Sequence, residues 1–212
     1  MKNESLIHLM KDVQLIEELI GQINRNLKQV RRVNWLIKGY QMDDLGHVTH
    51  LNIAKCNLKG SWPSALFKLK HLEFLDIQGN KIESIPDEIS RLSSLRCIDI
   101  RNNQIKGLPK SIVDIPQLQK LYMGNNHFTK IPELLTNCKA LKLIDFTDNM
   151  VSEGVEHILN SNSITNVYLR NNQLTDFPFH LIEDNKLKEL ILIENSIQET
   201  PSDLPLIGNL LL

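Results

Sequence analysis

Hydrophobic residues recur at a fixed spacing along most of this chain. The pattern is clearest in residues 95–117, where apolar side chains stand at positions one, four, six and eleven and an asparagine at position nine (Leu95, Ile98, Ile100, Ile105 and Asn103). Copies begin at Val48, Leu72, Leu95, Leu118, Leu141, Ile164 and Leu187, so the spacing is 24 residues once and 23 residues five times. A period of this length predicts a solenoid of stacked repeats.

Each repeat is expected to hold one short strand and one returning segment. Positions one, four and six should face the core, and positions three, five, seven and eight should face solvent, because side chains alternate along a strand. Parallel strands need a returning segment between them, which residues eleven to twenty-three supply. Position fifteen is a proline in Pro86, Pro109, Pro132, Pro178 and Pro201, which fits an irregular or short helical return.

The frame LxxLxLxxNxL followed by xxIPxxI resembles the leucine-rich repeat superfamily, and in particular the 23-residue repeats of bacterial and intracellular Ras-related proteins. The resemblance covers residues 48 to about 209. It implies an α/β solenoid, with a curved parallel sheet on the concave face and irregular or short helical segments on the convex side. It also implies a scaffold that binds other proteins, without naming the partner.

Position nine is predicted to be structural. A side-chain amide there can satisfy backbone groups that are freed where each strand bends into its return. The column consists of Asn80, Asn103, Asn126, Asn149, Asn172 and Asn195, with Cys56 in the first repeat.

Residues 4–38 carry apolar side chains three and four apart and are predicted to form a helix. The seam is Leu6, Leu9, Val13, Ile16, Ile20, Ile23, Leu27 and Val30. Asn3 or Ser5 could cap its start, Gly21 could divide it, and Gly39 suits its C-terminus after the basic residues Arg31, Arg32 and Lys38.

Two hypotheses describe this helix. A cap over the open end of the solenoid is favoured, because Leu15, Leu19, Trp35 and Leu36 widen the apolar face, and Trp35 and Tyr40 should then pack beneath the cap. The alternative is a dimerising coiled coil, which would make the protein a homodimer.

The expected organisation is residues 1–47 as cap and leading turn (the turn at 41–47), 48–209 as seven repeats, and 210–212 as the truncated start of an eighth repeat at Leu210. The first repeat has an extra residue within 60–63, where Trp62 should clamp the cap. The fifth repeat replaces its proline turn with residues 152–159, which predict a short helix. After Pro201 the tail either folds over the last repeat, or another subunit covers this edge, or the chain belongs to a longer protein.

Composition narrows the partners. The formal net charge is -1, so no general basic field favours nucleic acid or anionic lipid. The N-terminus lacks the continuous apolar stretch of a signal peptide, and no run approaches a membrane span. Cys56, Cys97 and Cys138 do not form the paired clusters of a secreted disulfide framework, so a cytoplasmic location is expected unless a specialised route exports the protein.

The sequence offers little chemistry, and we expect no cofactor, no metal and no catalytic residue. No GxxxxGK[ST] phosphate loop is present. His47 and His50 should face opposite sides of a strand and have no accompanying cysteine pair. Cys97 should be a free thiol on the concave face without an activating base.

The concave face is therefore the predicted binding site for a protein or peptide. Its exposed positions carry aromatic, apolar and charged side chains of the kind that protein interfaces select. The candidate contact residues are Phe74, Asp76, Asp99, Arg101, Tyr122, Leu143, Asp145, Tyr168, Arg170 and Ile191. Tyr122 and Tyr168 share a column two repeats apart and should form one patch about 10 Å long. The alternative function is a regulatory or oligomerising segment that self-associates through the N-terminal helix or the uncapped C-terminal edge.

Overall fold

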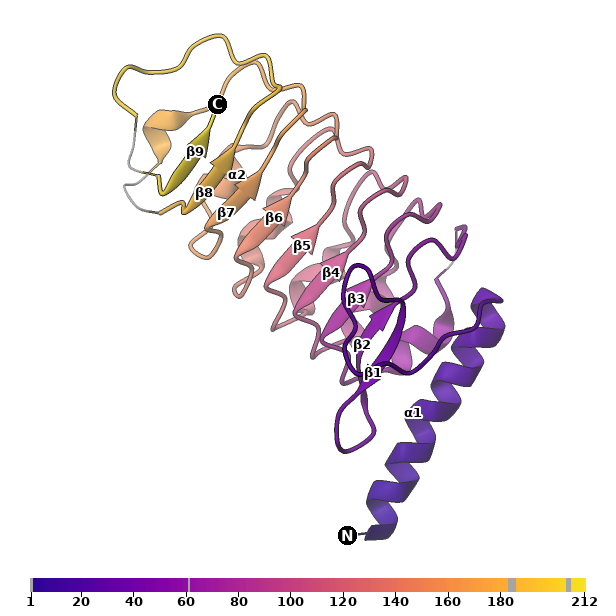
Figure 1. The fold of residues 1–212 in the computed structure, drawn as a ribbon. Coiled ribbons are helices and arrows are strands. Elements are labelled where there is room, and N and C mark those ends of the chain that lie inside the picture. Colours follow the sequence, from indigo (N-terminus) through magenta and orange to yellow (C-terminus); the bar gives the residue numbers. More distant parts are fainter. Residues whose placement is uncertain (1, 61, 183–185, 205–206) are drawn as a thin grey trace.

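The computed structural model describes residues 2–60, 62–182, 186–204 and 207–212, with only the backbone for residues 2–11. Within these ranges the strands form one sheet in chain order, antiparallel between β1 and β2 and parallel thereafter. They are β1 (Gly39–Met42), β2 (Val48–Asn52), β3 (Phe74–Asp76), β4 (Cys97–Asp99), β5 (Lys120–Tyr122), β6 (Leu143–Asp145), β7 (Asn166–Tyr168), β8 (Glu189–Ile191) and β9 (Asn209–Leu211). Figure 1 shows them side by side along one elongated array. The predicted α/β solenoid is confirmed.

The returning segments on the convex side are short helical turns. The 3-10 helices are η1 (Ser64–Lys68), η2 (Asp87–Arg91), η3 (Lys110–Asp114), η4 (Glu133–Asn137) and η5 (Phe179–Leu181), and each follows a proline directly. The fifth repeat has the α-helix α2 (Glu156–Leu159) instead, within the segment predicted to be helical. Proline suits these starts because its fixed φ is compatible with a helical first turn and its missing N–H is not needed there.

The strand register follows the sequence period. His50 lies opposite Phe74, 24 residues away, and each later pair as far as β8 is offset by 23 residues. The position-four side chains are fully buried and stack through the core: Leu51, Leu75, Ile98, Leu121, Ile144, Val167 and Leu190. The core is thus a continuous apolar column, to which each repeat adds one layer.

The asparagine column joins successive repeats through hydrogen bonds. Asn126 is typical: its Oδ1 accepts from the Ile105 amide at 3.0 Å, while its Nδ2 donates to the carbonyls of Ile100 at 3.0 Å and Met123 at 2.9 Å. The same pattern recurs at Asn80, Asn103, Asn149, Asn172 and Asn195. Each amide therefore satisfies backbone groups of its own repeat and of the preceding one, at the point where the strand ladder stops.

The residues at position eight turn the chain next to the asparagine column, at the end of each strand. They all have left-handed φ angles, between 51° and 66°. They are Lys55, Gly79, Asn102, Asn125, Asp148, Asn171 and Glu194. Asparagine, aspartate and glycine tolerate this conformation best, which explains why they hold five of the seven places.

The N-terminal helix is shorter than the sequence pattern predicts. Helix α1 spans Lys2–Ile23, and Asn24 ends it with a left-handed φ of 49°. The predicted extension to residue 38 is wrong, as is the assignment of Arg31, Arg32 and Lys38 to its last turn. The apolar spacing continues beyond Ile23 because Leu27 and Val33, in an irregular segment, are buried against the repeats. Periodicity alone cannot distinguish such a segment from a longer helix.

Helix α1 covers the first repeat, as the cap hypothesis expects. Leu15, Ile16, Leu19 and Ile23 are buried, whereas Val13 of the predicted seam is exposed. The side chains of Leu6 and Leu9, and the caps predicted at Asn3 or Ser5, lie outside the described side chains. Polar contacts fix the helix on η1: Lys68 pairs with Glu18 at 3.0 Å and Gln22 donates to Ser64 at 3.0 Å. Asp12 Oδ2 also accepts from the Val48 amide, at 2.8 Å, at the start of β2.

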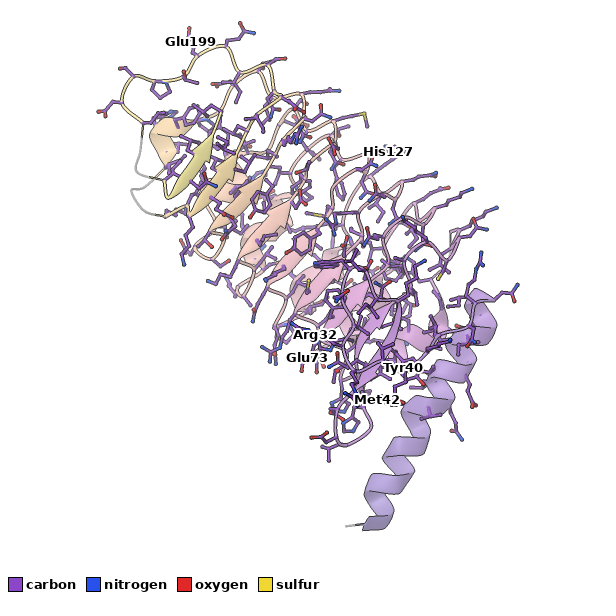
Figure 2. The ribbon with its side chains drawn as sticks, in the orientation of Figure 1. Arg32, Tyr40, Met42, Glu73, His127 and Glu199 are labelled. Carbon is purple, nitrogen blue, oxygen red and sulfur yellow. The ribbon has the colours of Figure 1, made fainter. Side chains whose placement is uncertain are left out.

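Gly39 does not end a helix but opens β1. Its φ is 129°, and the Lys28 carbonyl oxygen lies 2.2 Å from where a Cβ would be. The Tyr40 amide donates to that carbonyl at 3.0 Å, and the Val30 amide donates to the Tyr40 carbonyl at 2.9 Å. Tyr40 and Met42 project from β1 and pack against the core (Figure 2). The predicted turn at 41–47 is thus partly strand, with the turn confined to 43–47.

Trp62 connects the first two repeats. It is buried, stacks on Phe67 with ring centroids 6.1 Å apart, and donates its indole N–H to the Ser84 carbonyl at 2.9 Å. Trp62 therefore places an aromatic side chain of the first repeat on the second repeat, on the convex side.

The tail adds a strand in a different phase from the one expected. β9 pairs in parallel with β8, and Leu210 lies opposite Leu190, a position-four residue. The predicted start of an eighth repeat at Leu210 is therefore wrong in register, because the return before β9 is three residues shorter than a full repeat. Leu204, Ile207 and Leu210 are partly buried against the core, so the tail folds over the last repeat.

Replacing Gly39 by alanine should destabilise the N-terminal end. The Cβ would meet the Lys28 carbonyl and the φ would be strained, so we expect a loss of at least about 2 kcal/mol in unfolding free energy. Gly21→Ala is the matched control: it lies on α1 with no atom within 4 Å of its Cβ position, and we expect a gain of about 0.5–1 kcal/mol. Urea denaturation measures both, and equal effects would contradict the close approach at Gly39.

Asn126→Ala should destabilise the repeats. It leaves the Ile105 amide without its acceptor, whereas the Ile100 and Met123 carbonyls keep a second amide donor, so we expect a loss of roughly 2 kcal/mol. The nearby exposed Gln104→Ala should change the unfolding free energy by less than about 0.5 kcal/mol. If the two variants unfold at the same urea concentration, the asparagine column is not a major contributor to stability.

Candidate binding face

The register of the strands brings most of the predicted contact residues onto one face. In column three His50, Phe74, Cys97, Lys120, Leu143, Asn166 and Glu189 lie side by side, and in column five Asn52, Asp76, Asp99, Tyr122, Asp145, Tyr168 and Ile191. Asp145 separates Tyr122 from Tyr168 in this column. With neighbouring strands about 4.8 Å apart, the two tyrosines lie about 10 Å from each other.

The segment between α1 and β1 crosses this face. Figure 1 shows it arching over the strands of the first repeats, and its contacts place Trp35 against the concave sheet. The Trp35 ring lies 4.7 Å from Phe74 and 5.3 Å from Tyr122, measured between centroids. The prediction that Trp35 packs beneath the helical cap is wrong, because α1 ends twelve residues earlier, at Ile23, and leaves this segment free to turn onto the sheet.

Arg101 completes the aromatic cluster. Its Cζ atom is 5.2 Å from the Trp35 ring centroid and 5.3 Å from that of Tyr122. Asp99 holds the guanidinium in place, accepting from Nε at 3.0 Å and from Nη2 at 2.5 Å, and this hydrogen bonding raises the pKa of Arg101. Each ring contact contributes about 0.5–1.5 kcal/mol and each cation–π contact about 0.5–2 kcal/mol, enough together to keep the segment on the sheet.

Three column-five side chains are not exposed. Asn52, Asp76 and Asp99 are fully buried, so the prediction that they face solvent is wrong. Each accepts a hydrogen bond from the amide two residues later, with Oδ1 distances between 3.0 and 3.1 Å. This local bond ends the strand in the same way in these three repeats, and the half-buried Asp145 repeats it at 2.9 Å. An asparagine or aspartate at position five, where the strand ends, is the sequence signal for this capping role.

Asp76 has an unusual protonation equilibrium. Its pKa is raised to about 6, mainly by burial and in part by the neighbouring charge of Asp99, while hydrogen bonds from the Gln78 amide and side chain at 3.1 Å oppose the rise. A carboxyl group so placed carries its charge at neutral pH only at a cost to folding.

The C-terminal part of the face is linked separately. Tyr168 donates a short hydrogen bond to Glu189 Oε2, which also accepts from Asn166 at 2.6 Å. Desolvation, followed by this bond, raises the pKa of Tyr168 to about 12, and the Tyr168 hydroxyl lowers the pKa of Glu189. Arg170 pairs with Glu194 at 2.5 Å and both are exposed. Tyr122 is thus part of the Trp35 cluster, and Tyr168 part of a polar group two strands away.

A hollow of about 360 Å³ lies beside the aromatic cluster. It is lined by Trp35, His50, Glu73, Phe74, Arg96, Cys97, Gln119, Lys120 and Tyr122. Arg96 pairs with Glu73 at 3.5 Å, and Lys120 is exposed. Leu143, Asp145 and Ile191 are half-buried further along the face. The surface available to a partner therefore runs from the hollow towards Ile191.

The face shows no sign of redox or metal chemistry in the described residues. Burial raises the pKa of the Cys97 thiol to about 12, which disfavours the reactive thiolate. Across the described ranges no three histidine, cysteine or acidic side chains gather where they could hold a metal ion, and no helix is long and apolar enough to span a membrane. His47 stacks on His71 with ring centroids 3.9 Å apart and pairs with Asp43 at 3.1 Å.

Comparison with known families agrees with the geometry. Residues 40–161 match the leucine-rich repeat region family. The chain belongs to this leucine-rich repeat family. Its members are typically non-catalytic and commonly bind proteins or peptides. The comparison with curated proteins found no match.

Solved leucine-rich repeat structures share the fold. One is a leucine-rich repeat protein of Leptospira interrogans, with a TM-score of 0.65 and 24% identity over 79% of this chain and 51% of that one. The plant peptide hormone receptor RGFR1 in complex with RGF2 has a TM-score of 0.56 and 28% identity over 69% and 24%. The receptor kinase GASSHO1/SCHENGEN3 of Arabidopsis thaliana in complex with CASPARIAN STRIP INTEGRITY FACTOR 2 has a TM-score of 0.56 and 32% identity over 69% and 18%. The chain thus spans about half the length of the first and a quarter or less of the receptors.

Asp76→Asn should change how stability depends on pH. Because the folded-state pKa of Asp76 is raised, the folded protein binds the proton more tightly, and this contribution to stability is lost as pH rises from about 4 to about 6. Asn52 shows that an amide fits this position, so the variant should gain roughly 3 kcal/mol relative to wild type between pH 4 and pH 7. Thermal unfolding at several pH values measures this difference, and a constant offset between the two proteins would contradict the raised pKa.

Proposed function

We propose that this leucine-rich repeat chain is a non-enzymatic scaffold that binds a protein or peptide on its concave face. The observation that carries the proposal is the in-register row of half-buried aromatic, apolar and charged side chains on consecutive strands. The contact residues are Phe74, Arg101, Tyr122, Leu143, Asp145, Tyr168, Arg170 and Ile191, while Asp76 and Asp99 support them from beneath. Because the strands are fixed by the repeats, a ligand would meet a preformed surface, which lowers the entropic cost of binding.

The related structures are consistent with this proposal. RGFR1, a peptide hormone receptor, is in complex with RGF2, and GASSHO1/SCHENGEN3 is in complex with CASPARIAN STRIP INTEGRITY FACTOR 2. We further propose that the repeats are of the bacterial or intracellular Ras-related type, and that the protein works in the cytoplasm. The free thiols Cys56, Cys97 and Cys138 favour a reducing compartment.

Replacing both concave tyrosines should abolish partner capture. The Tyr122→Ala, Tyr168→Ala double variant removes two half-buried rings from the face, and each hot-spot aromatic contributes about 2 kcal/mol or more to an interface, so the affinity should fall roughly 100-fold or more. Leu181→Ala, which removes an exposed apolar side chain from η5 on the convex side, is the matched control and should retain the partner.

The measurement is affinity capture from the source cell, followed by a binding curve for each captured protein. For the comparison to be valid, the urea midpoint of the double variant must differ from that of the wild type by no more than the midpoint of Leu181→Ala does. If a folded double variant captures the same protein with the same affinity as the wild type, the concave face is not the binding site.

Self-association is the alternative function and stays a prediction. Leu211 and Leu212 at the β9 edge are about half exposed, and Val13 on α1 is also exposed. A molar mass that rises with concentration in light scattering, and that falls when Leu211 is replaced by lysine, would favour this alternative over a partner-binding scaffold.

A further inference from the structure

The concave face already holds one peptide segment, which is the chain's own residues 33–37. Trp35 lies in a cradle whose sides are Phe74, Tyr122 and Arg101, at 4.7, 5.3 and 5.2 Å. Beside the ring, the Asn34 main-chain carbonyl accepts a hydrogen bond from Asn52 Nδ2 at 2.8 Å. The sheet thus recognises an aromatic side chain together with the carbonyl of the preceding residue.

The cradle is held in place by groups other than its occupant. Asp99, which is fully buried, fixes the Arg101 guanidinium through three hydrogen bonds of 2.5 to 3.0 Å. Asn52 is oriented by its own Oδ1, which accepts from the Ala54 amide at 3.0 Å. Phe74 and Tyr122 stand on β3 and β5, two strands apart. The cradle would therefore keep its shape if Trp35 left it.

Within the described part of the chain, two hydrogen bonds tie the occupant to the sheet. The Val33 amide donates to Gln41 Oε1 at 3.1 Å, and Asn52 Nδ2 donates to the Asn34 carbonyl at 2.8 Å. The Leu36 and Ile37 amides donate to Asn34 Oδ1 within the segment, at 2.9 and 3.0 Å, so they do not join the sheet. Leu36 is 92% exposed, and Trp35 itself is 39% exposed. The hollow beside Trp35 leaves room for residues that flank an aromatic side chain. The segment can be exchanged for a ligand without disrupting strand pairing.

We propose that this cradle is a subsite for an aromatic residue of a peptide ligand, and that Trp35 fills it in the free protein. The inference rests on the proposed function of the concave face and adds the chemistry of one ligand residue. The ligand presents a tryptophan or tyrosine ring to Phe74, Tyr122 and Arg101 and a main-chain carbonyl to Asn52. Since ligand and Trp35 exclude each other, the apparent affinity of the ligand falls with the fraction of molecules in which the cradle is occupied.

The test uses a synthetic peptide with the sequence of residues 31–38, RRVNWLIK, added to the whole chain. In the Trp35→Ala variant the cradle is open, and the peptide should bind at least 10-fold more tightly than to the wild type. Leu36→Ala is the matched control from the same segment and should behave as the wild type. The same peptide with alanine at its tryptophan should not bind, and adding Tyr122→Ala to Trp35→Ala should abolish binding.

Amide chemical shifts in NMR titrations measure each dissociation constant, with melting curves to show that each variant is folded. Trp35→Leu, which keeps an apolar side chain without the ring, replaces Trp35→Ala if the latter unfolds. The proposal is overturned if the variant and the wild type titrate alike. It is equally overturned if the folded open variant gives no saturable shift up to about 5 mM peptide, the range of effective concentration of a tethered segment.

This outcome is separable from that of the proposed function. If the peptide fails but the wild type still captures a protein that the Tyr122→Ala, Tyr168→Ala variant loses, the concave face binds its partner without an aromatic subsite at Phe74. If both experiments fail, the face is not a binding site.

Discussion

The constraint on which the rest of the structure depends is the need to satisfy backbone groups where each short strand ends. Strands of three residues leave amides and carbonyls at every bend, and in a buried position each unpaired group costs about 1–3 kcal/mol. The asparagine column resolves this by bonding to its own repeat and to the preceding one. Left-handed residues at position eight and capping side chains at position five complete the turn. Together they fix the direction of each side chain on the concave face.

The two ends of the sheet are covered by different kinds of structure. At the N-terminal end α1 covers the first repeat, Asp12 accepts from Val48 at the start of β2, and Lys28 to Val30 pair with β1 through the close approach that Gly39 permits. At the C-terminal end β9 continues the sheet, and within this strand Leu210 packs half-buried against the core while Leu211 is exposed. The segment that closes the first end also reaches the concave face. Stability of the cap and occupancy of the candidate site are therefore properties of one stretch of chain.

The candidate site consists of contact residues on the concave surface and of buried residues that hold them in position. Asp99 is buried and holds Arg101, and Asp76 is buried and ends its strand, so their charges act on the face indirectly. Tyr122 and Tyr168 share a column but have different neighbours, one aromatic and cationic, the other acidic. A ligand that covered both would meet two distinct chemical environments about 10 Å apart. The free surface is narrower than a list of outward positions suggests, because Trp35 already covers part of it.

The sequence by itself determined the solenoid, the strand register from Val48 to Ile191, the asparagine column and the two columns of the concave face. A period repeated seven times is a redundant signal, and side-chain alternation follows from strand geometry alone. Only the tertiary structure decided the end of α1 at Ile23, the position of Trp35, the burial of Asp76 and the register of β9. The end of α1, the position of Trp35 and the register of β9 occur once in the chain, so no repetition supports them. The burial of Asp76 recurs at Asn52 and Asp99, but side-chain alternation assigns their column to the solvent side. The apolar spacing predicts that Leu27 and Val33 are buried, but it does not determine whether they belong to a helix or to an irregular segment.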